Sequence, residues 1–307
     1  MAKGNMSIKE TSSYRILIVY NYPISPPRKT IWDHLYSFKN YSGNKCFYLN
    51  TALGNIPSHI MKIQFDIVIF HTTFLSKRSD FAAFRRLLSK SELLKSIKAT
   101  KIALPQDEFM NTQSLSDFIM EFGIDFVFSV APESEWKKIY ADVDFERVKF
   151  YNILTGYLDC GTIDKINKLS EGHGERTIDI GYRAWRSAPW LGRHGYLKKV
   201  IADVFNKEAP KAGLKVDIST RDEDTFYGDE WYKFLLKCKY TIGVEGGASI
   251  LDKDGTIKAK TDNYMKENPN ASYDEVEAAC FAGLDGSLNL FAISPRHLEA
   301  CATRTCQ

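Results

Sequence analysis

The sequence lacks any segment typical of a membrane span or a secretory leader. No run approaches the roughly 18 consecutive apolar residues that a membrane-crossing helix needs. The N-terminal stretch MAKGNMSIKETSS has no apolar core, so it does not resemble a signal peptide. We therefore expect a cytoplasmic protein with at most peripheral membrane contact, and we expect residues 1–13 to form a disordered tail.

Clustered cysteines are also absent. The six cysteines are scattered, none forms a C-x-x-C pair, and the one close pair, Cys301 and Cys306, has no partner at metal-ligand spacing. This pattern argues against a disulfide scaffold and against a cysteine-based zinc site. It is typical of reduced, mostly buried thiols in a cytosolic protein. We expect no bound metal.

The sequence has neither a strong charge of one sign nor the common nucleotide-binding glycine motifs. The formal net charge is +3, and the 26% of charged residues are of mixed sign. That balance is too mild for a nucleic-acid-binding face but is compatible with a local basic pocket for a phosphorylated ligand. There is no G-x-G-x-x-G after the first apolar run and no G-x-x-x-x-G-K-[ST], which argues against dinucleotide and P-loop sites.

The first half of the chain alternates continuous apolar runs with helical patterns. Continuous runs are typical of strands buried on both faces, as in a parallel sheet covered by helices. The repeated strand–helix order predicts a doubly wound, Rossmann-like domain over residues 14–155. Its expected strands are 14–20, 45–49, 65–70, 101–104, 125–130 and 148–154.

The second half begins the same α/β pattern again, so the 307 residues predict two domains. A polar connection at 156–176 precedes a second Rossmann-like domain at 177–307. We expect its strands at 177–182, 214–219, 240–244 and 289–293. The polar segment 248–288 interrupts this rhythm and predicts an insertion or lid near the cleft. Residues 304–307 resemble the approach to another strand, so we expect a truncated C-terminal domain.

Polar residues gather where the apolar runs of the first half end. Ligands of open parallel sheets bind beyond the carboxyl ends of the strands. Asp107 and Glu108 follow one such run, and either carboxylate could act as general base for a sugar hydroxyl. Helix capping by Asp107 is the alternative. His71 ends another run, where it is either a base or a satisfied polar residue.

A basic loop follows the first strand of the second half. Arg183, Arg186, Arg193 and His194 lie between a strand and a helix, and a diphosphate needs several donors and a helix N-terminus. We expect Arg183 and Arg193 to bind phosphate, with an exposed basic loop as the alternative.

Two further strand ends offer ligand contacts. The stretch Glu245, Gly246, Gly247 and Ser249 would let a ligand approach the backbone, unless it is only a tight turn. Ser294 is the expected N-cap of a helix at 295–302, in which Arg296 and Glu299 share one face. Glu299 could accept both hydroxyls of a ribose, and a surface ion pair with Arg296 is the alternative.

The second half resembles the donor-binding domain of GT-B glycosyltransferases, in particular group-1 and spore-maturation-type glycosyltransferase-like proteins of bacterial polysaccharide clusters. The resemblance is carried by IDIGYRAW with the Arg186 that follows it, by VEGGAS at 244–249, and by ISPRHLEACATRT at 293–305. It implies two Rossmann-like domains facing a cleft, with the donor ribose on Glu299 and the donor phosphates on Arg183 and Arg193. It also implies metal-independent chemistry, with the nucleotide sugar as substrate and no cofactor.

These patterns predict a glycosyltransferase that moves a sugar from a nucleotide diphosphate to a saccharide or lipid-linked acceptor. The acceptor is expected on the first domain, near the loop at 23–28, His71 and the Asp107–Glu108 pair. Alternatives on the same scaffold are a sugar-nucleotide epimerase or hydrolase, and a non-catalytic protein that binds a sugar nucleotide or a glycan. A Rossmann oxidoreductase is disfavoured by the missing glycine motif. We expect no nucleic-acid partner.

Overall fold

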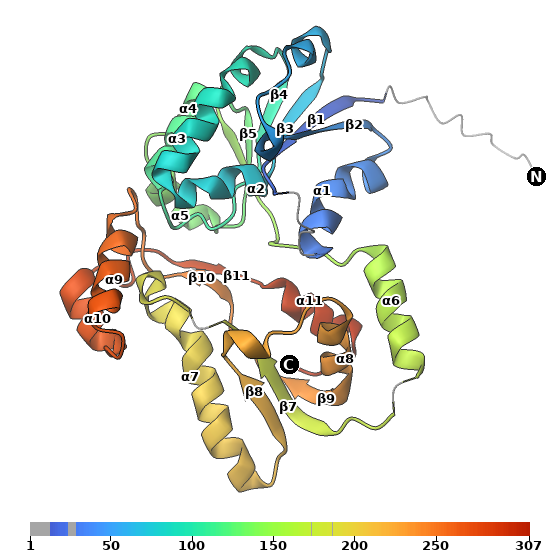
Figure 1. The fold of residues 1–307 in the computed structure, drawn as a ribbon, viewed down its shortest axis with the longest axis vertical. Helices are drawn as coiled ribbons and strands as arrows, with labels where there is room; N and C mark the ends of the chain where they lie inside the picture. The colour runs from blue at the N-terminus through green and yellow to red at the C-terminus, as the bar shows by residue number, and fades with distance from the viewer. Residues whose placement is uncertain (1–12, 24–28, 173, 186) are drawn as a thin grey trace, which may run out of the picture.

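The continuous apolar runs of the first half form one parallel sheet in the computed structural model, which describes residues 13–23, 29–172, 174–185 and 187–307 (Figure 1). The spatial order of its six strands is β2-β1-β3-β4-β5-β6. The strands are β1 (Arg15–Tyr20), β2 (Lys45–Asn50), β3 (Ile67–Phe70), β4 (Thr100–Ala103), β5 (Phe126–Ser129) and β6 (Lys149–Asn152). The six strands predicted from the sequence are therefore confirmed, with ends that differ by up to two residues.

Both faces of this sheet are buried under helices. In β1, Ile16 and Ile18 pack on the side of Leu35 from α1 (Lys29–Ser42). The alternate residues Leu17 and Val19 belong to the larger core on the opposite face. That face is covered by α2 (Thr72–Leu75), α3 (Phe81–Lys90), α4 (Thr112–Glu121) and α5 (Glu133–Ile139). The two-sided burial explains why the inner strands carry runs of consecutive apolar residues, such as Ile16–Val19 in β1.

The chain reverses its direction of travel across the sheet between β1 and β3. From β1 it passes through α1 to β2 on one side, and β3 then pairs with β1 on the other side. Open parallel sheets bind ligands at such a switch point, beyond the carboxyl ends of the strands. The residues after β1 and β3 therefore border the expected ligand site.

The second half builds a smaller parallel sheet with the order β8-β7-β9. Its strands are β7 (Ile178–Arg183), β8 (Val216–Ser219) and β9 (Cys238–Thr241), with α7 (Gly192–Glu208), α8 (Asp229–Lys237) and α11 (Pro295–Ala302) around them. The predicted approach to another strand corresponds to a parallel bridge between Tyr240 and Cys306. We call the six-stranded sheet with its helices the first lobe, and the three-stranded sheet with its helices the second lobe.

The predicted strand at 289–293 does not join the second parallel sheet. Instead β11 (Leu290–Ala292) pairs antiparallel with β10 (Gly246–Ala248), so the expected turn at 245–249 is partly a strand. The physical reason is burial, because Leu290 and Ala248 belong to the hydrophobic core of the first lobe. Gly247 adopts φ +124° and its backbone passes against the Leu290 carbonyl, where a side chain would clash.

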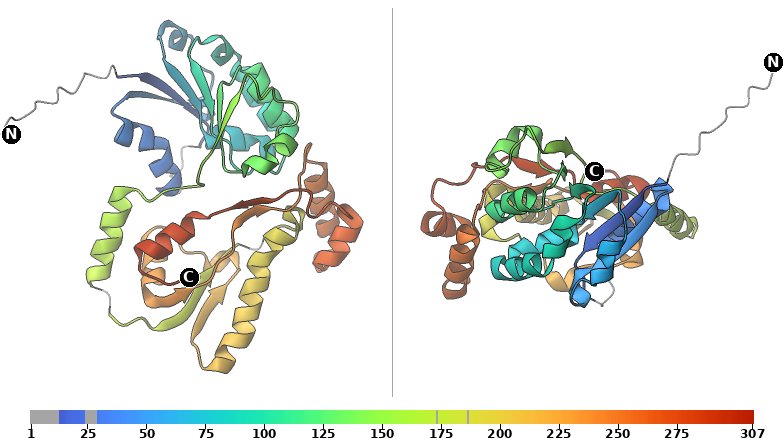
Figure 2. Two further views of the ribbon diagram at one scale, coloured as in Figure 1. Left: turned by 180° about the vertical axis from the view of Figure 1, so that it is seen from behind. Right: turned by 90° about the horizontal axis from the view of Figure 1, so that it is seen from above.

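The insertion forms the two predicted helices, α9 (Thr256–Glu267) and α10 (Tyr273–Cys280). It docks on the first lobe through backbone hydrogen bonds, from Asn111 N to Asp252 O at 2.7 Å and from Asp252 N to Phe109 O at 2.8 Å. The two lobes are thus joined on two sides, by this segment and by the connection that leads into α6 (Cys160–Glu171) (Figure 2).

The described helices and the six cysteines bear on two of the expectations from the sequence. Among the described helices, none combines the length and apolar content needed to cross a membrane. All six cysteines are free, but only Cys238 and Cys280 are buried, so the expectation of mostly buried thiols was wrong. The predicted tail at 1–13 falls outside the described residues except for Ser13.

Candidate functional site

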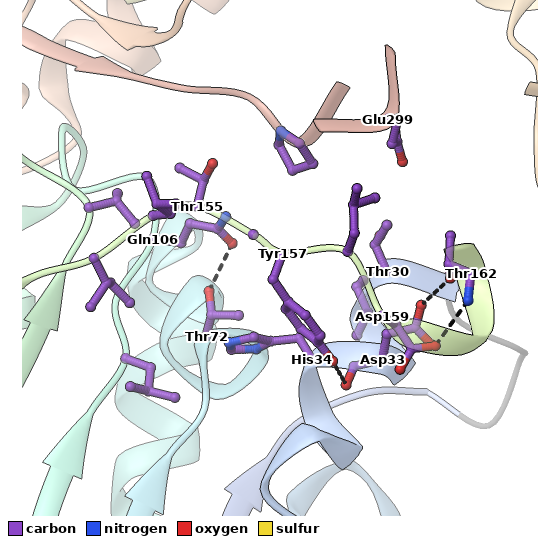
Figure 3. Close-up of a pocket in the computed structure, with 18 of the residues that line it drawn as sticks. Thr30, Asp33, His34, Thr72, Gln106, Thr155, Tyr157, Asp159, Thr162 and Glu299 are labelled. Carbon is purple, nitrogen blue, oxygen red and sulfur yellow. Dashed lines mark hydrogen bonds between the residues drawn. The ribbon is translucent and has the colours of Figure 1, made fainter. Parts of the chain in front are cut away.

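A cavity of about 150 Å³ lies at the carboxyl end of the six-stranded sheet, between the two lobes (Figure 3). The first lobe contributes α1 and the ends of β3, β4 and β5, and the second lobe contributes α8 and α11. The segment that connects the lobes forms a further wall. The polar lining residues are Thr30, Asp33, His34, His71, Thr72, Gln106, Thr155, Tyr157, Asp159, Thr162, Tyr232 and Glu299.

Two histidines from neighbouring elements meet in this pocket. His34 lies on α1, which follows β1, and His71 directly follows β3, so the switch point of the sheet brings them together. The Nδ1 atom of His34 is 2.8 Å from the Nε2 atom of His71. His71 is fully buried, and burial together with His34 lowers its pKa to about 3. Burial also lowers the pKa of His34, so both rings are neutral at pH 7.

Carboxylates and a lysine tie α1 to the start of α6 beside the pocket. Lys29 Nζ lies 2.5 Å from an Asp33 carboxylate oxygen and donates to Thr162 Oγ1 at 2.7 Å. Asp159 caps α6, and the hydrogen bond from Tyr41 is the main reason that its pKa is lowered. Asp159 is therefore charged at neutral pH, and Lys29, whose Nζ atom lies 3.9 Å from its carboxylate, offsets part of that charge.

Glu299 reaches the pocket from the second lobe. The helix α11 starts at the Ser294–Pro295 pair, as the sequence predicts, and Glu299 lies one turn into it. Its Oε2 atom accepts a hydrogen bond from Trp231 Nε1 at 2.7 Å. Burial raises the pKa of Glu299, although the Trp231 bond and the Arg296 charge act in the opposite direction. In Figure 3, Glu299 lies across the pocket from α1.

The two carboxylates proposed as catalytic bases do not line the pocket. Glu108 is fully buried, and its carboxylate accepts hydrogen bonds from Ser129 Oγ, Tyr140 Oη and the Val130 backbone nitrogen. A substrate hydroxyl has no access to it, so the catalytic prediction for Glu108 was wrong.

Asp107 lies outside the pocket too. Its backbone carbonyl accepts a bond from Arg78, and its φ of 56° turns the chain away from the strand end. The alternative, that Asp107 caps a helix, was also wrong, because α4 begins at Thr112 with Asn111 as its N-cap.

The side chains of Arg183 and Arg193 are occupied by other protein groups. Arg183 donates to Asp217 Oδ1 at 2.6 Å and to the Asp224 carbonyl at 3.0 Å, and it stacks over Phe226 and Phe234. Arg193 pairs with three carboxylates of the insertion, those of Asp274, Glu277 and Asp285. Neither arginine joins Glu299 in the pocket. Arg186 lies outside the described residues.

The remaining predicted binding residues separate into two groups. Ser249 is buried and bonds Asp285 at 2.6 Å, while Gly246 and Gly247 pair with β11 and Glu245 is exposed beside them. Ser294 and Arg296 lie at the start of α11, next to the pocket residues Pro295 and Glu299. Of the predicted acceptor loop at 23–28, residues 24–28 are outside the described residues.

A lysine that the sequence argument missed lies near Arg296. Burial, and then the positive charge of Arg296, lower the pKa of Lys198 on α7, while the Asp107 carboxylate acts in the opposite direction. Among the described residues, neither Lys198 nor Arg296 forms an ion pair with a carboxylate. Arg296 instead donates to the Arg183 carbonyl at 2.6 Å.

Sequence reasoning also missed His34, Asp33, Tyr157 and Asp159. His34 and Asp33 could have been found from the rule that ligands bind at the switch point of an open parallel sheet, since that rule points to the start of the helix after the first strand. The connecting segment carried no comparable signal, because its polar residues were interpreted as a linker. No group of three or more possible metal ligands occurs among the residues that the structure describes.

Comparison with known proteins does not extend these observations. No protein-family model, curated protein or solved structure matches the chain.

Proposed function

We propose that this chain is a glycosyltransferase of the GT-B type, which moves a sugar from a nucleotide diphosphate to a saccharide or lipid-linked acceptor. The observation that carries the proposal is the pocket between the lobes, which lies beyond the carboxyl ends of a doubly wound sheet. Glu299 enters that pocket from the second lobe, as the resemblance to GT-B donor-binding domains requires of a ribose ligand. An α/β scaffold alone would not support a function.

The chemistry of the pocket favours an uncharged, hydroxyl-rich ligand. Its polar wall consists of carboxylates and neutral groups such as Thr72 and Gln106, which hydrogen-bond each other at 3.3 Å. Its apolar wall includes Leu104, Val130 and Pro295. Sugars and ribose offer alternating hydroxyl and C–H surfaces, whereas a diphosphate would be repelled by Asp33, Asp159 and Glu299.

The diphosphate fits better beside the pocket, at Lys198 and Arg296. Burial and the nearby charge of Arg296 both disfavour the charged form of Lys198, and an anion placed with the two cations would offset that cost. Arg296 lies one helical turn before Glu299, so a donor could place its ribose on Glu299 and its phosphates near Arg296. These two residues replace Arg183 and Arg193 in our assignment.

Two alternatives give different products. A sugar-nucleotide epimerase or hydrolase would release an isomerised or free sugar without an acceptor. A non-catalytic binding protein would hold the sugar nucleotide and release it unchanged.

A thermal-shift panel of UDP-, GDP- and dTDP-sugars tests the proposal. A ligand at 100 times its Kd adds about 2.7 kcal/mol to the free energy of unfolding, which is a readily measured shift in Tm. We expect at least one sugar nucleotide to raise the Tm, and we expect its free nucleoside diphosphate to do so as well. Product analysis with and without saccharide acceptors then separates transfer from hydrolysis and isomerisation. If no sugar nucleotide in the panel changes the Tm, the proposal fails.

A further inference from the structure

A chain of three hydrogen-bonding groups leads from the backbone of α2 to the pocket. The Thr73 backbone nitrogen donates to His71 Nδ1 at 3.2 Å, so that the His71 side chain caps α2, and the Thr73 hydroxyl oxygen lies 3.0 Å from the same ring nitrogen. His71 Nε2 lies 2.8 Å from His34 Nδ1. His34 lines the pocket, and no described residue hydrogen-bonds its Nε2 atom.

The first of these bonds decides the protonation of both rings. A backbone N–H can only donate, so His71 Nδ1 is unprotonated, and the Thr73 hydroxyl, which can donate or accept, is then a second donor to it. Because the ring is fully buried and neutral, its proton is on Nε2, which then donates to His34. His34 Nδ1 is therefore the acceptor, and the neutral His34 ring carries its own proton on Nε2.

We propose that His71 is a positioning residue that holds His34 in the Nε2-protonated tautomer, so that His34 presents a hydrogen-bond donor to a ligand oxygen in the pocket. His34 then differs from a general base, because its only unprotonated nitrogen is occupied by His71. A sugar hydroxyl or ring oxygen is the class of acceptor that this donor would bind. That ligand class rests on the proposed function, whereas the tautomer does not.

The groups that face His34 agree with this role. Asp33 lies on the same helix, His71 comes from the end of β3, Tyr157 and Asp159 come from the connecting segment, and Glu299 comes from α11. All of these except His71 present oxygen atoms. Tyr157 donates its hydroxyl to the Asp33 backbone carbonyl at 2.7 Å and is therefore not free to donate elsewhere. His34 supplies the pocket with a neutral donor among groups that mainly accept.

NMR spectroscopy of the full chain labelled with ¹⁵N-histidine tests the tautomer directly. At pH 7 we expect His34 and His71 each to show a one-bond N–H correlation at Nε2 and an unprotonated Nδ1. The exposed His59 serves as the internal reference for an unrestrained ring. A wild-type spectrum with His34 protonated at Nδ1, or charged at pH 7, overturns the inference without any variant.

The variant His71→Asn sharpens the test. Asparagine is a good N-cap and keeps an acceptor for the Thr73 N–H, but it has no group at the position of Nε2. We expect His34 to become a mixture of tautomers in this variant, and an unchanged His34 spectrum would contradict the positioning role. Titration with UDP-glucose tests the proposed ligand class. We expect the His34 Nε2 signal to shift more than that of His59. If UDP-glucose leaves both signals unchanged, the assigned ligand is wrong while the tautomer result still decides the role of His71.

Discussion

Trp231 Nε1 donates a hydrogen bond to Glu299 Oε2 at 2.7 Å, within the second lobe and at the edge of the pocket. This bond joins α8 to α11 and orients the one predicted donor-binding carboxylate that the structure places in the pocket. Among the described residues, no protein group hydrogen-bonds the second carboxylate oxygen of Glu299. A ligand hydroxyl is a suitable donor for that oxygen.

Glu299→Gln should stabilise the ligand-free protein relative to wild type as the pH rises. Burial raises the pKa of Glu299, so the folded state binds its proton more tightly than the unfolded state. The wild type therefore loses stability as the pH rises from the unfolded pKa through the folded pKa, and glutamine removes this dependence. Urea unfolding at pH 4, 6 and 8 measures the effect. A wild-type advantage that grows with pH would contradict the assigned pKa direction.

His71→Asn should weaken the acid sensitivity of folding. The pKa of His71 is lowered to about 3, so the unfolded state binds more protons than the folded state below the ordinary histidine pKa. This group alone should cost the wild type roughly 2 kcal/mol between pH 6.5 and pH 5. We expect the variant to lose less over that interval, as measured by urea unfolding. His59→Asn, at an exposed position, should keep the wild-type slope.

Arg183→Ala should reduce stability and leave nucleotide affinity nearly unchanged. The guanidinium bonds Asp217 and a backbone carbonyl and covers two aromatic rings, so its loss should cost about 2–3 kcal/mol of unfolding free energy. Arg193→Ala removes exposed ion pairs and should cost under about 1 kcal/mol. Chemical denaturation and calorimetric titration measure the two effects. A large loss of nucleoside diphosphate affinity in folded Arg183→Ala would restore its predicted role.

Leu290→Ala should destabilise both lobes together. Leu290 comes from the C-terminal half but is buried in the core of the first lobe, and such truncations cost about 2–5 kcal/mol. Trp136 of the first lobe and Trp231 of the second lobe should report one shared thermal transition, at a lower temperature than in wild type. Leu284→Ala, at an exposed site, is the matched control. Two separate transitions in the wild type would show that the lobes unfold independently.

The parallel sheet of the first lobe could be predicted because the burial of each strand is visible in the residues of that strand alone. Leu17 and Ile18 are neighbours in the sequence and pack into cores on opposite faces of the sheet. A strand that is covered on both faces is therefore apolar at consecutive positions, and this pattern can be recognised in the sequence. The helices of the insertion could be predicted as well, since Ser272 and Glu275 form a capping box at the start of α10.

The site was harder to predict because its contacts are not local. His34 and His71 are 37 residues apart, and only the pairing of β1 with β3 brings them together. The sequence does not indicate a partner for the Arg183 side chain, but the pairing of β7 with β8 places Asp217 beside it. The pairing of β11 with β10 also could not be predicted, because the partner core belongs to the other half of the chain.

The most direct test of the account compares a nucleoside diphosphate with pyrophosphate in calorimetric titrations of Glu299→Ala. The ligand is UDP, or GDP if the thermal-shift panel selects that base. Because Glu299 is assigned to the ribose and Lys198 with Arg296 to the phosphates, nucleotide binding should weaken about 10-fold and pyrophosphate binding should not change. Glu230→Ala, at an exposed position on the neighbouring helix α8, should leave both affinities unchanged. Equal losses for both ligands, or unchanged nucleotide affinity in Glu299→Ala, would contradict the account.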